Sequence, residues 1–336
     1  MRIKFFKRLD RLQCLLNPEK KKIMGQTLSE PVTTKKSAYC INSKYRVGSS
    51  CMQGWRITME DCHVHILSLP DDPGTAFFAV YDGHGSAAMA QHAGKHLHEY
   101  IIKRSEYKAG NIVQAIQQGF LELDKAMQND VTLKDEQAGT TVIALLIKDN
   151  ILYSANAGDS RAVASINGRA VPLSRDHKPT LKDERERIEA AGGWVEFNRV
   201  NGLLALSRAL GDFMFKRNER KSAQEQIVTA FPEVQEFKIT DDWEFVVLAC
   251  DGIWDVMTSS EVVDFVRARL MPSGPNNEWM DPEEICEELI KHCLAPDAIM
   301  GTGCDNMTVV LVCFHHGKPY FFSIPRCKES LISTKP

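Results

Sequence analysis

Apolar residues between positions 45 and 315 gather in short runs that alternate with longer amphipathic stretches. Short runs rich in β-branched and aromatic residues, bounded by Gly, Asp or Asn, are typical of buried strands. They predict strands at 76–81, 141–147, 151–157, 161–166, 203–206, 245–250 and 308–314. Stretches with an apolar residue every three or four positions, or with capping residues at their start, predict helices at 112–127, 259–270 and 282–294.

The predicted strands come in consecutive groups instead of alternating one by one with helices. Residues 152–173 predict a meander of hairpins with turns at Gly158–Asp159 and Asn167–Gly168. Asn-Gly between apolar strands is a strong signal for a two-residue hairpin turn. Grouped hairpins separated by grouped helices favour antiparallel sheets with helices outside them, and a doubly wound parallel sheet is the alternative.

The composition is that of an ordinary globular protein. With 336 residues and 43% hydrophobic content, the chain can bury a sizeable core in one large domain or two ordinary ones. The formal charge of -3 provides no overall attraction to nucleic acid. Ten cysteines without a CxxC pair favour reduced core residues in a cytosolic or nuclear protein. The apolar runs are far shorter than the ~20 residues of a bilayer span.

The N-terminal segment differs from the rest of the chain. Residues 1–23 carry eight Lys/Arg against two acidic residues, with leucines at helical spacing. A basic amphipathic arm of this kind favours peripheral membrane contact or a transit peptide, and a solvated extension is the alternative. The run MGQTLS from Met24 matches the N-myristoylation pattern, so Gly25 would anchor the protein to membranes if translation starts at Met24.

Several acidic residues stand beside predicted strands, although they are scattered along the chain. Asp82 and Asp251 each end an apolar run and precede Gly, Asp305 comes just before one, and Glu60–Asp61 form a pair upstream. We expect these carboxylates to meet at one edge of a sheet. Carboxylate oxygens are hard donors that suit Mg²⁺ or Mn²⁺, and carboxylates gathered at one site repel one another unless a cation offsets them.

A pair of such ions activates water and favours hydrolysis of phosphoesters. His84 is suitably placed in the sequence to protonate a leaving group, and Arg56 to bind phosphate oxygens. From their spacing alone, these residues fit an ordinary interpretation equally well. Asp-Gly is common in turns, and Arg56 and His84 would then be solvent-exposed side chains without a catalytic role. A metal-dependent nuclease and a catalytically dead binding scaffold are the other functional hypotheses. The near-neutral charge counts against the nuclease.

Eight motifs in order strengthen the case for a phosphatase. They are SSCMQGWRITMEDCH (49–63), FFAVYDGHGS (77–86), AGTTVIALLI (138–147), LYSANAGDSRAV (152–163), LSRDHKPTLKDERERIEAAGG (173–193), GLLALSRALGDFMFK (202–216), FVVLACDGIWDVMTSSEVVDFV (245–266) and GCDNMTVVLV (303–312). With these motifs the chain resembles the protein phosphatase 2C family of metal-dependent protein serine/threonine phosphatases. The resemblance implies hydrolysis of phosphoserine and phosphothreonine in proteins by metal-activated water, without a phosphoenzyme.

The resemblance also implies roles for single residues. Arg56 would clamp phosphate and His84 would be the general acid, and Thr141 and Asn306 would support the ligands. Two Mg²⁺ or Mn²⁺ ions and a weaker third would be held, directly or through water, by Glu60, Asp61, Asp82, the Gly83 carbonyl, Asp159, Asp251, Asp255 and Asp305. A catalytically dead relative would be expected to have lost metal ligands. The five principal carboxylates are all present, which favours an active enzyme: Glu60, Asp61, Asp82, Asp251 and Asp305.

For the fold, the resemblance implies an α+β sandwich of two antiparallel sheets with helix pairs on both outer faces. The domain would span 45–315, between a partly disordered lead-in (1–44) and a flexible tail (316–336). The region 168–225 would be a variable flap that contributes to substrate choice. A monomer acting on phosphoproteins, with no nucleic-acid partner, is expected. Ser86 stands where the family often has Gly or Ala. The helical C-terminal extension of some members is not expected here.

Overall fold

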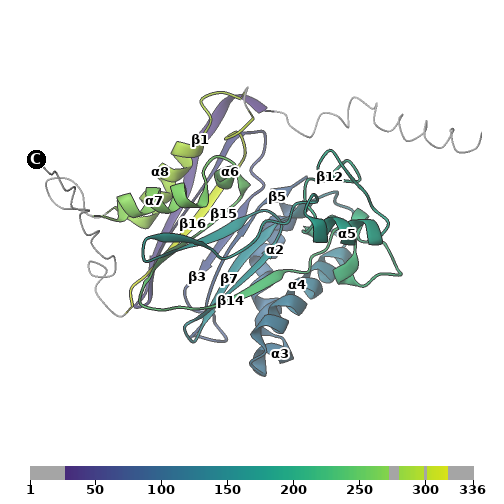
Figure 1. The fold of residues 1–336 in the computed structure, drawn as a ribbon, viewed down its shortest axis with the longest axis horizontal. Coiled ribbons are helices and arrows are strands. Elements are labelled where there is room, and N and C mark those ends of the chain that lie inside the picture. Colours follow the sequence, from purple (N-terminus) through teal and green to yellow (C-terminus); the bar gives the residue numbers. More distant parts are fainter. Residues whose placement is uncertain (1–26, 272–279, 299–300, 317–336) are drawn as a thin grey trace, which may run out of the picture.

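Two antiparallel sheets packed face to face form the centre of the protein (Figure 1). The computed structural model describes residues 27–271, 280–298 and 301–316. The six-stranded sheet has the order β1 (Thr27–Ile41), β2 (Tyr45–Arg56), β16 (Met307–Phe314), β15 (Trp243–Ala249), β9 (Arg161–Ile166), β10 (Arg169–Pro172). The five-stranded sheet has the order β14 (Glu233–Lys238), β8 (Ile151–Ala157), β7 (Val142–Lys148), β4 (Ala76–Tyr81), β3 (Cys62–Ile66).

Helices cover the outer face of each sheet (Figure 1). The six-stranded sheet carries α6 (Asp251–Trp254), α7 (Ser259–Leu270) and α8 (Pro282–Cys293). The five-stranded sheet carries α2 (Ala88–Ile102), α3 (Ser105–Lys108) and α4 (Ile112–Asn129). The predicted α+β sandwich is therefore confirmed. Every pairing between neighbouring strands of the two sheets is antiparallel in the described residues, which excludes the doubly wound alternative.

The core consists of three apolar layers, one between the sheets and one under each group of helices. Strand β4 shows why, because its side chains alternate between two of these layers. Phe78 and Val80 lie between the sheets, whereas Phe77 and Tyr81 face the layer under α2 and α4. All six residues of β4 are buried. A strand buried on both faces reads as a continuous apolar run, which is the pattern seen in the sequence.

Most of the predicted elements are confirmed to within a few residues, and the errors are instructive. The segment 203–206 is not a strand, since Leu203 is in a turn with its side chain exposed and only an isolated bridge joins Leu204 to Val200. Neither strand β1 nor strand β2 is predicted from the sequence. Strand β1 lies at the edge of its sheet and is largely exposed and polar, so it lacks the apolar run that marks a buried strand.

The predicted meander is half right. The hairpin at Asn167–Gly168 is confirmed, since β9 and β10 pair directly. The hairpin at Gly158–Asp159 is wrong, because β8 pairs with β7 and β14 while β9 pairs with β15 and β10. The chain crosses from one sheet to the other at this turn, where Gly158 has a φ of 128°. Both edges of β8 are already occupied, so β9 joins the opposite sheet and Asp159 lies at the crossover.

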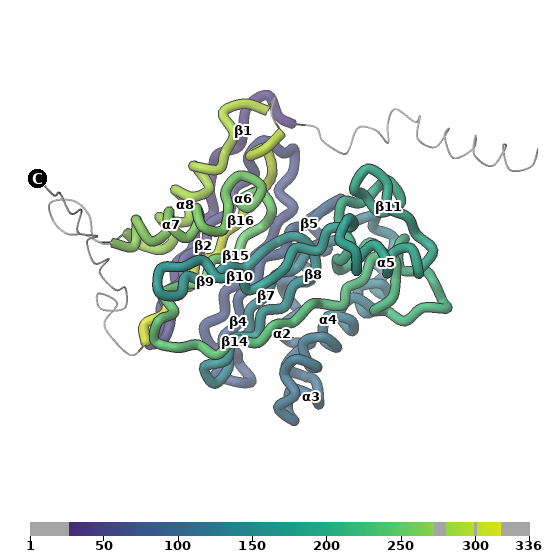
Figure 2. The backbone as a smooth tube through the Cα atoms, in the orientation of Figure 1, coloured from purple at the N-terminus to yellow at the C-terminus, as the bar shows by residue number. Residues whose placement is uncertain are grey.

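An irregular region beside the sandwich contains most of the predicted flap (Figure 2). It comprises α5 (Lys182–Ala190), β11 (Val195–Glu196), β12 (Arg199–Val200), η2 (Phe213–Phe215) and η3 (Ala223–Glu225). The region has its own apolar cluster around Ile188 and Phe215. Glu184, only 1% exposed, receives hydrogen bonds from Arg187, Arg208 and Ser207 and so ties α5 to the following loop.

A third, three-stranded sheet links the flap to the sandwich. Its order is β13 (Leu210–Gly211), β6 (Gly139–Thr140), β5 (Gly83–His84). This small sheet brings Leu210–Gly211 of the flap next to the residues that follow β4.

Two predictions from composition can be compared with the described residues. Cys250, Cys286 and Cys293 are buried thiols, which agrees with reduced core cysteines. No helix within the described ranges has the length and apolar character needed to cross a bilayer. The basic arm, Met24 and Gly25, and nearly all of the predicted tail lie outside the described residues, so those predictions stand untested.

Candidate metal centre

The acidic residues meet at one end of the sandwich because strand ends from both sheets meet there. The end of β4 lies beside the start of β3, and the end of β15 lies beside the start of β16. The start of β16 also lies beside the end of β2. Asp82 follows β4, Asp251 follows β15, and Asp305 precedes β16. From the sequence, we expect the carboxylates to meet at one edge of a single sheet. In the structure they meet where the ends of two sheets lie together.

Asp82 is at the centre of the acidic cluster. One group of possible ligand atoms comes from Asp61, Asp82 and Cys250, and a second from Asp82, Asp159 and Asp251. Within each group the ligand atoms lie within 4.8 Å of one another. Asp82 is thus the carboxylate common to both groups, as expected of a residue shared by two ions.

The remaining predicted ligands lie around this centre. Asp305 and Asp255 are close enough to Asp251 for their charges to raise its pKa. The Glu60 carboxylate accepts a hydrogen bond of 2.8 Å from the Thr58 hydroxyl instead of joining either ligand group. Gly83 passes so close to Glu60 that a Cβ on the glycine would lie 2.3 Å from the Glu60 carbonyl oxygen. Only a glycine fits at that point.

Burial and mutual repulsion perturb these carboxyl groups strongly. Burial raises the pKa of Asp61 to about 7, with the charge of Asp305 adding to the rise and a hydrogen bond from Thr308 opposing it. Burial is the main cause that raises the pKa of Asp82 and of Asp251 well above the usual value of a carboxyl group. The charges of neighbouring aspartates raise both further. Such a cluster is stable at neutral pH only if protons or cations offset its charge.

The donor set fits hard divalent cations. Asp61 Oδ2 accepts a hydrogen bond of 2.7 Å from Thr308, but its buried Oδ1 has no hydrogen-bond partner within the described residues. A buried carboxylate oxygen without a donor is well suited to a metal ion or its bound water. The Cys250 thiol donates to the Asn306 carbonyl at 3.5 Å and accepts from the Thr308 N–H at 3.2 Å. The carboxylate oxygens are therefore better placed than this thiol to act as ligands.

Two polar residues hold the backbone around the cluster. Asn306 donates to the carbonyls of Gln53 and Thr58 at 2.8 and 2.9 Å and accepts from the Glu60 N–H at 2.9 Å. It thereby fixes the loop after β2 against β16. The Thr141 N–H donates to the Asp82 carbonyl at 2.9 Å, and the Thr141 hydroxyl lies 2.7 Å from that of Ser160.

The two predicted catalytic side chains also lie at this end of the molecule. The Arg56 guanidinium forms an ion pair with Asp305, and its side chain is 44% exposed. The His84 Nε2 atom lies 2.8 Å from Asp212 Oδ2. Burial alone lowers the pKa of His84, but the charge and hydrogen bond of Asp212 outweigh this effect, and Asp159 and Glu60 add to it, so the pKa is raised.

Sequence reasoning missed two residues of the site. Asp212 follows Gly211 in the ALGDF run, and Lys178 follows His177 in the RDHKP run. The Lys178 ammonium pairs with Asp159. Burial lowers the pKa of Lys178, but Asp159, Asp251 and Asp255 more than offset this and raise it, so the ammonium stays charged. Both motifs had been recognised, but an Asp or Lys in a loop carries no sign of which distant carboxylate or imidazole it meets.

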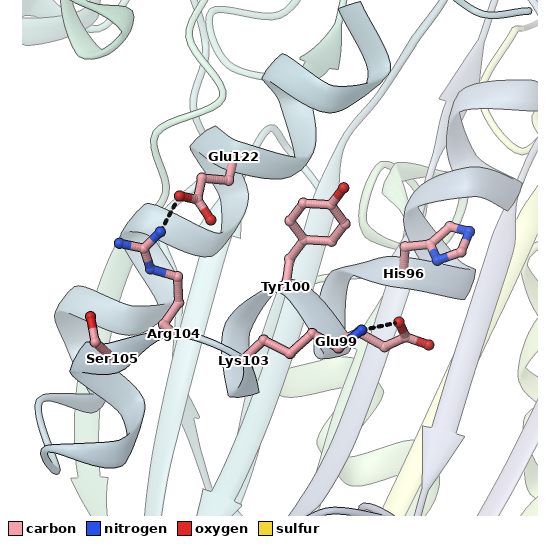
Figure 3. Close-up of a pocket in the computed structure, with 7 residues that line it drawn as sticks. All are labelled: His96, Glu99, Tyr100, Lys103, Arg104, Ser105 and Glu122. Atoms are coloured by element: carbon pink, nitrogen blue, oxygen red, sulfur yellow. Dashed lines mark hydrogen bonds and ion pairs between the residues drawn. The ribbon is translucent and has the colours of Figure 1, made fainter. Parts of the chain in front are cut away.

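A hollow elsewhere is a weaker candidate for a site. It encloses about 530 Å³ between α2, α3 and α4 (Figure 3). The charged groups lining it pair with one another, Arg104 with Glu122 and Lys103 with Glu99. These pairs leave the charges of the hollow satisfied internally, in contrast to the excess of carboxylates at the end of the sandwich.

Comparison with known proteins gives a consistent result. A family model described as protein phosphatase 2C matches residues 45–300. A probable protein phosphatase 2C of Caenorhabditis elegans is 59% identical over 312 residues, covering 93% of this chain and 86% of that protein. Protein phosphatase 2C homolog 2 of Hypocrea jecorina is 48% identical, covering 88% of this chain and 68% of that protein. The crystal structure of a phosphatase from Toxoplasma gondii superposes with a TM-score of 0.71 at 28% identity, covering 83% of this chain and 96% of that chain.

Proposed function

The chain belongs to the protein phosphatase 2C family and is a protein serine/threonine phosphatase, a hydrolase; from this premise we propose how its acidic centre works. The centre uses Mg²⁺ or Mn²⁺ to hydrolyse phosphoserine and phosphothreonine in proteins by direct attack of water, without a phosphoenzyme. Bound ions of this kind supply a nucleophilic water near neutral pH and positive charge for the phosphoryl oxygens.

Each residue has a task in this proposal. Asp82 would be shared by two ions, and Glu60, Asp61, Asp251, Asp305 and the Gly83 carbonyl would complete their surroundings, directly or through water. Asp159 and Asp255 would join Asp251 around a weaker third ion. Arg56 holds non-reacting phosphate oxygens with its planar guanidinium. His84 gives a proton to the serine or threonine oxygen as the P–O bond breaks, because an alkoxide is a poor leaving group.

The observation that carries the proposal is the position of Asp82 in both ligand groups. One carboxylate shared by two groups of possible ligands is the arrangement that a binuclear centre requires. The buried Asp61 oxygen without a hydrogen-bond partner supports the same conclusion. Zinc is a poorer match, because the two groups contain four aspartates, one cysteine and no histidine.

The test is hydrolysis by the purified full chain in Mn²⁺ and in EDTA. We expect release of phosphate from a phosphothreonine peptide only in Mn²⁺, and loss of this activity in Asp251→Ala with the fold retained. The matched control is Asp71→Ala, which removes an exposed carboxylate from the loop at the opposite end of β4. Retention of most of the wild-type rate by Asp251→Ala would contradict the assignment of the site.

The same assay distinguishes the competing functions. A binding scaffold would leave both the peptide and p-nitrophenyl phosphate intact at millimolar Mn²⁺. A nuclease would cleave the diester bis-p-nitrophenyl phosphate faster than the monoester. We expect the monoester and the phosphothreonine peptide to be the better substrates.

A further inference from the structure

His84 has a buried acidic partner that lies outside the metal centre. Asp212 Oδ2 is 2.8 Å from His84 Nε2, and Asp212 is only 8% exposed. Neither group of possible ligand atoms in the described residues includes Asp212. We propose that Asp212 is a positioning residue that fixes the ring of His84 for proton transfer to the leaving group. This inference rests on the proposed phosphatase function.

The three-stranded sheet explains how residues 128 positions apart meet. Gly139 of β6 pairs with His84 of β5 on one side and with Gly211 of β13 on the other. The imidazole and the carboxylate meet over this glycine. A Cβ at position 139 would lie 2.2 Å from Asp212 Oδ2 and 2.6 Å from His84 Nε2. Position 139 therefore has to be a glycine for the His84–Asp212 pair to form.

The loop that carries Asp212 is held firmly from behind. Asp212 adopts a left-handed conformation with a φ of 52°, and its N–H donates to the Ala138 carbonyl at 2.9 Å. Asp124 of α4 accepts hydrogen bonds from the Gly211 N–H at 2.8 Å and from Lys216 Nζ at 2.7 Å. A non-glycine residue in this conformation carries a cost in backbone energy, and such conformations cluster at functional sites.

The pairing determines which atom of His84 can act. With Nε2–H donating to Asp212, the proton available to the substrate is the one on Nδ1. As water oxygen bonds to phosphorus, the P–O bond to serine or threonine breaks and its electron pair stays on that oxygen. The oxygen takes the Nδ1 proton, and the proton lost by the attacking water returns through solvent to Nδ1. The products are the alcohol and inorganic phosphate, with Nε2–H held on Asp212 throughout.

A leaving-group comparison in Mn²⁺ tests the inference with the full chain. The substrates are a phosphothreonine peptide, whose alkoxide needs a proton, and p-nitrophenyl phosphate, whose phenolate does not. For Asp212→Asn we expect kcat on the peptide to fall about tenfold to a hundredfold and kcat on p-nitrophenyl phosphate to fall less than about threefold. The KM values and the melting temperature should stay close to wild type.

Two further variants separate positioning from a structural role. The double variant Asp212→Asn/His84→Gln should be no slower than His84→Gln alone, because both changes disable one proton transfer. Gly139→Ala should reproduce the selective loss on the peptide by displacing the pair without changing a charge. Asp135→Asn, an exposed residue on the loop before β6, is the matched control for loss of one negative charge.

The outcomes are distinct. Equal losses on both substrates, unchanged rates, or additive losses in the double variant would overturn the role of Asp212. A wild-type chain inactive on both substrates would instead contradict the proposed function, and the inference with it.

Discussion

Replacement of Asp61 by Asn should stabilise the metal-free protein, although it damages the metal centre. Burial raises the pKa of Asp61 from 3.8 to about 7. At a pH above that value, ionisation of this one buried carboxyl opposes folding by about 4 kcal/mol, since each tenfold change in an acid constant is about 1.4 kcal/mol. The amide of Asn carries no charge, so the substitution removes this cost.

The substitution also has a free-energy cost, because it changes the hydrogen bonding of the side chain. The Asn oxygen can still accept from the Thr308 hydroxyl, which lies 2.7 Å from the carboxylate. The new NH₂ group replaces a buried oxygen that has no hydrogen-bond partner, and leaving it unsatisfied costs about 1–3 kcal/mol. The balance is a gain of about 1–3 kcal/mol in EDTA at pH 7.5, or a rise of several degrees in melting temperature.

The gain should depend on pH and on metal. The folded pKa of Asp61 is above the unfolded value, so the native state holds more protons between about pH 4 and pH 7, and metal-free stability falls as pH rises through that window. The advantage of Asp61→Asn should therefore shrink at pH 5. In Mn²⁺ the advantage of the variant should shrink, because ion binding adds about 2.7 kcal/mol to the wild type at a hundred times Kd and less to the variant.

Thermal unfolding followed by circular dichroism, in EDTA and in Mn²⁺ at pH 5 and pH 7.5, measures all of these effects. The control Asp71→Asn removes an exposed charge and should change little. An Asp61→Asn protein that melts below the wild type in EDTA at pH 7.5 would refute the repulsion argument. So would an advantage that is the same at both pH values.

Two further predictions concern the flap and the proposed third ion. Glu184→Gln leaves the partly buried Arg187 and Arg208 without their shared carboxylate, so we expect a loss of about 3–5 kcal/mol of stability and faster proteolysis of the flap. Unchanged melting and cleavage would contradict this. Lys178→Met removes the ammonium that pairs with Asp159, so we expect about tenfold tighter Mn²⁺ binding in an electron paramagnetic resonance titration of unbound Mn²⁺. Equal Mn²⁺ affinity in the two proteins would show that Lys178 does not compete with the ion.

Agreement between sequence and structure is best where burial alone decides the pattern. Strand β4 is buried on both faces and reads as an unbroken apolar run, so its position could be predicted to the residue. Helix α7 begins as expected from polar residues at its start, and the Thr258 side chain caps it by accepting from the Glu261 N–H. Strand β1 is an exposed edge strand, and no apolar pattern marks it.

The sequence by itself determined the class of protein and the chemistry of the donors. Its ordered motifs identify the family, and the scattered carboxylates indicate hard metal ions. Tertiary structure alone decided which side chains meet. It sends Gly158–Asp159 across from one sheet to the other, and it brings Asp212 to His84 and Lys178 to Asp159. Local sequence governs backbone conformation and burial, whereas contacts between distant residues depend on how strands pair and sheets pack, and only the folded chain specifies these.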